Sequence, residues 1–78
     1  MKYANRKVVD TKSSLNTPGG VVVAGVAIRV LIAGTVYSGG KVIGFNSDGN
    51  IVYRDTYAWL EHVALPEDVK MVGEWKGE

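Results

Sequence analysis

The feature of this chain that most constrains its fold is an Asp48-Gly49 pair placed between two short apolar runs. Asp-Gly in this setting is typical of a tight β-hairpin, because glycine adopts a positive φ without steric cost. The runs on either side are rich in valine, isoleucine and aromatic residues, which favour extended backbone. We therefore predict an antiparallel hairpin over residues 41–55, with its turn at 46–50. Gly44, inside the first strand, leaves space for another backbone or an aromatic ring to approach closely.

The other apolar residues also fall in short runs rich in β-branched side chains. Two strands, or one strand bent at Gly25, are predicted over residues 21–24 and 26–33. The β-branched residues of the second run alternate, so Arg29 should point to the opposite, partly solvated face. Residues 69–75 are predicted to form a final strand.

The segments between these runs are predicted to be loops. Residues 10–20 are rich in Ser, Thr, Asn, Pro and Gly, and residues 34–40 contain several glycines. Residues 56–65 fit either a short helix, stopped by Pro66, or a strand followed by a one-turn helix at 65–69. The sequence leaves these two alternatives open.

A chain of 78 residues has room for one small domain. We expect residues 1–20 to form an N-terminal strand or arm plus a loop, and residues 21–78 to form a small β-barrel. The fold class is mainly β, with five or six short antiparallel strands and at most one short helix or 3-10 turn. Curling into a barrel removes the exposed edges that an open sheet would leave.

The composition of the chain bears on its location and on the partners it can bind. Residues 20–37 carry a single charge, Arg29, but an arginine in mid-membrane costs about 2.5–3.5 kcal/mol, so we expect no membrane segment. The absence of cysteine fits a reducing, cytoplasmic location. A core this small gains from self-association, which favours a homo-oligomer. The net charge of +1 gives no general attraction to nucleic acid.

Catalytic and metal-binding patterns are weak. The one histidine, His62, has no partner set in the sequence that defines a nucleophilic or metal site. We therefore expect no metal, no cofactor and no catalytic residues, and the sequence favours a non-enzymatic protein.

Aromatic and basic residues gather around the predicted hairpin and form the candidate binding face. Such interleaving can anchor a protein partner or stack nucleic-acid bases. If Val52 points inward, Tyr53 points outward and Arg54 returns toward the inner face or the rim. Trp75, near the C-terminal end, is a candidate exposed aromatic residue. The members of the candidate face are Tyr37, Lys41, Phe45, Tyr53, Arg54, Tyr57 and Trp59.

The run Gly40-Lys41-Val42-Ile43-Gly44-Phe45, followed by Asp48-Gly49-Asn50-Ile51-Val52-Tyr53, together with Arg29-Val30 and Gly34, resembles the early strands and turn of SH3-like small barrels. It is similar to the KOW type, which binds RNA or ribosomal and transcription proteins. It is also similar to the plasmid-encoded type II dihydrofolate reductases, in which a Val-Gln-Ile-Tyr segment lines a pore made by four subunits. The nearest string here is Asn50-Ile51-Val52-Tyr53, and the chain has no glutamine.

Three functions follow as hypotheses. The first is a small non-enzymatic binding module that engages a protein partner through the aromatic and basic face. The general character of the chain also resembles accessory proteins encoded by phages and other mobile elements. The second is nucleic-acid binding through Lys41, Arg54 and the tyrosines. The third is a small oligomeric, reductase-like enzyme with its site on a symmetry axis, where residues such as Tyr53 would be repeated.

Overall fold

The computed structural model describes residues 5–32, 36–55 and 60–73. This part of the chain contains seven short strands and one 3-10 turn. The strands are β1 (Leu15–Thr17), β2 (Gly20–Val22), β3 (Ala27–Ile32), β4 (Val36–Phe45), β5 (Ile51–Asp55), β6 (Glu61–Ala64) and β7 (Val69–Val72). The 3-10 turn, η2, spans Pro66–Asp68 and lies between β6 and β7.

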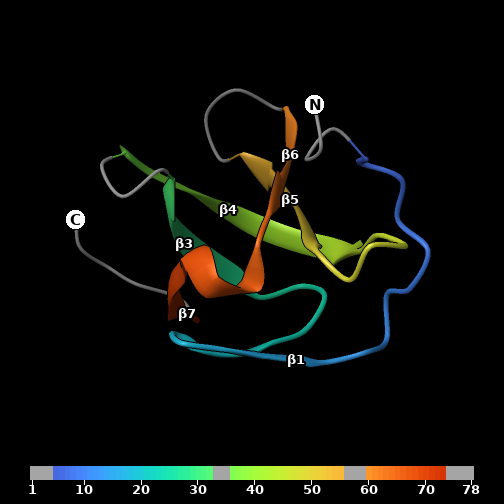
Figure 1. Cartoon of the computed structure of the whole chain (residues 1–78), viewed down its shortest axis with the longest axis horizontal. Coiled ribbons are helices and arrows are strands. Elements are labelled where there is room, and N and C mark those ends of the chain that lie inside the picture. Colours follow the sequence, from blue (N-terminus) through green and yellow to red (C-terminus); the bar gives the residue numbers. More distant parts are fainter. Residues whose placement is uncertain (1–4, 33–35, 56–59, 74–78) are drawn as a thin grey trace.

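Five of the strands form one antiparallel sheet in the order β6-β5-β4-β3-β7, and β1 and β2 form a separate hairpin. Strands β3 to β6 follow one another as a meander, whereas β7 returns to the far side of β3. Figure 1 shows the long strand β4 crossing the molecule, with β3 and β7 to one side of it and β5 and β6 to the other. In the described residues β6 and β7 are not paired with each other.

The core lies between the inner face of this sheet and the β1–β2 hairpin. Ile28 and Val30 of β3 are almost completely buried there, and Val22 enters from the hairpin. Arg29, between the two β3 core residues, is only partly buried, as the alternation predicted. The remaining buried members of the core are Val42, Phe45, Ile51, Tyr53, Ala64 and Val69.

The β4–β5 hairpin is confirmed. Strand β4 ends at Phe45 and β5 begins at Ile51, so the turn occupies the predicted residues. Gly49 has a φ of 81°, which the Asp-Gly pattern requires. The buried side chain of Asn46 accepts hydrogen bonds from the backbone N–H groups of Asp48 (3.0 Å) and Asn50 (2.9 Å) and so stabilises the turn.

The N-terminal segment, residues 5–10, crosses the outer face of this hairpin. In Figure 1 it is the blue trace that passes the hairpin tip before continuing to β1. Asp10 pairs with Phe45 as an isolated antiparallel bridge. A Cβ atom at Gly44 would overlap Val8 Cγ1 and lie 2.9 Å from the Asp10 carbonyl oxygen, so the expected close approach at Gly44 is confirmed. The segment thus acts as a strap over the hairpin.

This strap explains an error in the predicted orientation of β5. Tyr53, not Val52, belongs to the core cluster, and Arg54 is exposed. Val52 is nevertheless fully buried, because it lies on the outer face opposite Gly44, where the strap covers it. Both faces of β5 are therefore buried at Val52 and Tyr53. For this reason the apolar pattern alone did not show which of the two faces the core.

Two predicted loops contain strand residues. Part of residues 34–40 belongs to β4, which begins at Val36, because its glycines permit close approach of the neighbouring strand. A Cβ atom at Gly40 would overlap the Arg54 carbonyl oxygen. Residues 10–20 contain β1 and the first residue of β2, joined by a tight turn.

The C-terminal half resolves one ambiguity. Residues 61–64 form β6, and the one-turn helix follows as η2, so the alternative of a strand followed by a single helical turn is correct for the described residues. Residues 56–59 lie outside the described part. The final strand is confirmed over Val69–Val72. It ends before Gly73, which has a φ of 102°, and residues 74–75, including Trp75, lie outside the described residues.

The fold class is mainly β, with short antiparallel strands and one 3-10 turn, as predicted. The described residues contain seven strands rather than five or six, because the predicted loop over residues 10–20 contributes β1. The sheet is not closed into a barrel by strand pairing in the described residues. A meander whose final strand returns beside its first is compatible with the small barrel that the sequence predicted.

Candidate functional site

The most distinctive polar feature of the outer sheet face is a pair of like charges. Lys41 of β4 and Arg54 of β5 are directly opposite each other in the antiparallel register, and both are exposed. Residues opposite each other on neighbouring strands project from the same face about 5 Å apart, where like charges destabilise the sheet. Two cations therefore lie side by side on this face of the sheet.

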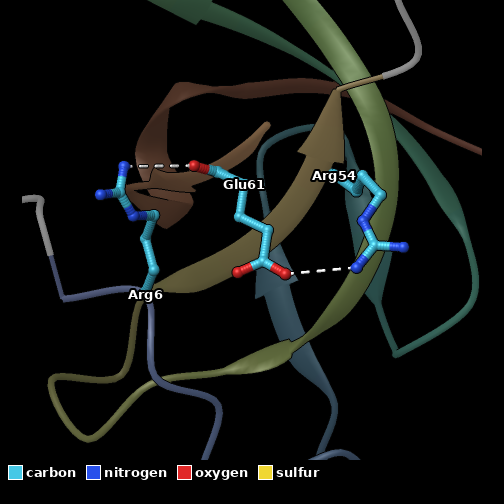
Figure 2. A network of polar contacts seen from close by, with 3 residues as sticks. All are labelled: Arg6, Arg54 and Glu61. Atoms are coloured by element: carbon cyan, nitrogen blue, oxygen red, sulfur yellow. Dashed lines mark hydrogen bonds and ion pairs between the residues drawn. The ribbon is translucent and has the colours of Figure 1, made fainter. Parts of the chain in front are cut away.

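Glu61 of β6 connects Arg54 to the N-terminal strap. Its side chain accepts an ion-paired hydrogen bond from Arg54 Nη2 at 3.2 Å, with both side chains substantially exposed. Its backbone carbonyl oxygen lies 3.5 Å from Arg6 Nη1. Figure 2 shows Glu61 between the two guanidinium groups, which approach it from opposite sides.

Charge compensation within this group is incomplete. Glu61 neutralises Arg54, but Arg6 contacts only a neutral carbonyl oxygen. Within the described ranges, neither Arg6 nor Lys41 has a carboxylate oxygen within ion-pair distance. We call this group of residues, Arg6, Lys41, Arg54 and Glu61, the basic face. It carries two cations that lack an anionic partner among the described residues.

A second polar group lies on the inner side of the sheet, beyond the core. The Tyr53 hydroxyl donates to Ser38 Oγ at 3.0 Å, and its ring lies 5.5 Å from the His62 ring in a tilted arrangement. His62 Nε2 lies 3.6 Å from Asp55 Oδ2. Burial raises the pKa of the Tyr53 hydroxyl, although the Ser38 hydrogen bond opposes the shift. The neutral phenol is therefore the form that this site favours.

The structure divides the candidate face predicted from the sequence. Lys41 and Arg54 are exposed and adjacent, whereas Phe45 and Tyr53 are buried in the core and add nothing to an exposed surface. Tyr37 belongs to β4, but its side chain lies outside the described part. Tyr57 and Trp59 also lie outside the described residues.

Sequence reasoning missed Arg6 and Glu61 as members of the site. They are separated by 55 positions in the chain. No local pattern links them, because they meet only where the Arg6 side chain reaches β6 from the strap. The basic residues at the N-terminus were visible in the sequence, but nothing there indicated which strand they would contact.

No group of three or more His, Asp or Glu side chains in the described residues could hold a metal ion. No helix in these ranges is long and apolar enough to cross a membrane. No protein-family model, curated protein or solved structure matches the chain significantly.

Proposed function

We propose that this chain is a small binding module that uses the basic face to engage an acidic segment of a protein partner. The observation that carries the proposal is the placement of Lys41 directly opposite Arg54 on exposed strands. A carboxylate of the partner that pairs with these cations would reduce the repulsion between them. This reduction would contribute to the free energy of binding.

The composition of the face favours a protein partner over nucleic acid. Phosphate-backbone binding normally draws on a continuous array of cations. Here Glu61 lies among the cations, and the whole chain has a net charge of only +1. A face that carries both cations and a carboxylate is complementary to a protein surface, on which charges of both signs occur.

The proposal is tested by titrating the protein with a short capped peptide of alternating Glu and Thr, and separately with an oligothymidylate, at low and physiological salt. We expect the peptide to bind, and Lys41→Gln to weaken binding by about two- to fivefold, as for an exposed ion pair. Lys70→Gln is the matched control, because Lys70 is an exposed lysine of the same sheet on the opposite edge strand.

Two results would overturn the proposal. One is that the acidic peptide fails to bind, or binds equally well to Lys41→Gln and Lys70→Gln. The other is that the oligothymidylate binds more tightly than the peptide, with a steep salt dependence, which would make the nucleic-acid alternative correct.

A further inference from the structure

Strand β6 lies at one edge of the five-stranded sheet and has backbone groups that point away from it. The Asp55 N–H donates to the Leu60 carbonyl at 2.8 Å. This bond shows that the backbone groups of Leu60 point toward β5, and so fixes which residues of β6 do the same. Because the direction of hydrogen bonding alternates along an antiparallel strand, His62 and Ala64 also bond toward β5. Glu61 and Val63 therefore direct their N–H and C=O groups outward.

These outward groups are only partly occupied. The Glu61 carbonyl receives the long 3.5 Å contact from Arg6. Outside the β5–β6 ladder, no described residue forms a hydrogen bond with the Val63 backbone. Leu60, next to the strand, is 58% exposed. At the other edge of the sheet, by contrast, the β1–β2 turn packs directly on β7, since a Cβ at Gly19 would lie 2.6 Å from the Lys70 backbone.

Arg6 covers this edge in a way that is easily reversed. A guanidinium at 3.5 Å from a neutral carbonyl is at the limit of hydrogen bonding. A carboxylate is a stronger partner, because charge-assisted hydrogen bonds are roughly twice as strong as neutral ones. An acidic side chain placed beside β6 would therefore compete for Arg6 and expose the Glu61 carbonyl.

We propose that the partner's acidic segment binds as an added strand along the outer edge of β6, and that Arg6 is the displaceable cover of that edge. The inference rests on the proposed function and adds a second contact to it. Because β6 is two strands away from Lys41, the carboxylate that meets Lys41 and Arg54 belongs to a residue of the segment outside the added strand. The backbone of the segment bonds to Glu61 and Val63, while its carboxylates on the outer face pair with Arg6. Glu61 remains paired with Arg54, so its carboxylate does not repel the carboxylates of the bound segment, which pair with Arg6.

The decisive experiment uses two N-methylated forms of the alternating Glu and Thr peptide. In an extended strand, all residues of one type direct their N–H groups to the same edge. Methylation of one residue type therefore removes donors facing β6, whereas methylation of the other leaves them intact. Strand addition predicts that one form binds about three- to tenfold more weakly than the other. In the complex, the Val63 amide should exchange with solvent more slowly than in the free protein.

Arg6 is tested with the same peptide and with a neutral peptide of alternating Gln and Thr. Arg6→Ala should weaken binding of the acidic peptide by about two- to fivefold and leave binding of the neutral peptide unchanged or stronger. Lys7→Ala, which changes a neighbouring exposed residue of the strap, is the control and should alter neither.

The two levels of the proposal fail differently. If the acidic peptide binds but both methylated forms bind equally, strand addition is wrong while the basic face remains the binding site. If Arg6→Ala weakens both peptides equally, Arg6 is not the cover. If the acidic peptide does not bind, the proposed function itself fails.

Discussion

The side-chain amide of Asn46 donates a hydrogen bond to the backbone carbonyl of Asn5, 41 residues earlier in the chain, at 2.7 Å. The same side chain accepts the two turn hydrogen bonds from Asp48 and Asn50. Asn46 is 4% exposed, and among the described residues it is the one polar residue that is buried. One side chain therefore closes the β4–β5 turn and holds the strap that carries Arg6.

Replacement of Asn46 should be costly. Asn46→Ala leaves the Asn5 carbonyl and two turn N–H groups without this partner, and we expect a loss of about 1–3 kcal/mol in the free energy of unfolding. Urea denaturation provides the measurement. Asn16→Ala, at an exposed position of β1, should stay within about 0.5 kcal/mol of the parent. Equal effects of the two substitutions would contradict the role assigned to Asn46.

Gly44→Ala tests the contact between the strap and the hairpin. The new methyl group would overlap Val8 Cγ1 and crowd the Asp10 carbonyl, so we expect a destabilisation of about 1–3 kcal/mol. Val8→Ala in the same chain should recover part of this loss, because it removes the closest atom. A double-mutant cycle by denaturation measures the coupling, and strictly additive effects would show that Val8 does not pack on Gly44.

Reversal of the charge at Lys41 should separate stability from binding. Lys41→Glu places an anion opposite Arg54 and should raise the free energy of unfolding by about 0.2–1 kcal/mol. The same substitution should reduce binding of the acidic peptide. Lys41→Gln should fall between the parent and Lys41→Glu in both measurements. A loss of stability in Lys41→Glu would argue against repulsion between Lys41 and Arg54.

Asp10 should make the strap sensitive to acid. Hydrogen bonds from the Ser13 side chain and then from the Lys12 and Ser13 backbone lower its pKa below the ordinary value of 3.8. A carboxyl whose pKa is lower in the folded state stabilises the protein above its unfolded-state pKa. That stabilisation is lost as the pH falls through the lower, folded-state value. The parent should therefore have a higher Tm than Asp10→Asn at pH 6.

Thermal unfolding of both proteins across the acidic range provides the measurement. The difference in Tm should shrink as the pH falls below 3.8. Ser13→Ala removes the largest contribution and should move the pKa of Asp10 upward, as followed by NMR titration of its carboxyl group. A difference in Tm that does not change with pH would show that the ionised Asp10 carboxylate is not its cause.

The local patterns of the sequence predicted the strands and their turn well. The hairpin around Asp48-Gly49 and the buried alternation at Ile28 and Val30 depend on turn geometry and on side-chain periodicity, both of which act over a few residues. The glycines of residues 36–40 misled the prediction, because local propensity describes them as flexible. Close packing against the β5 backbone instead uses the missing side chain at Gly40.

For the candidate site, the sequence indicated Lys41 and Arg54 only as basic residues of the predicted hairpin. The register shift between Val42 and Gly44 decides that the two lie opposite each other. Tertiary structure alone decided that Tyr53 and Phe45 belong to the core and that Arg6 meets Glu61. The physical reason is the range of the interactions. Turn and strand preferences arise between near neighbours, whereas burial of both faces of β5 depends on a strap that arrives from the other end of the chain.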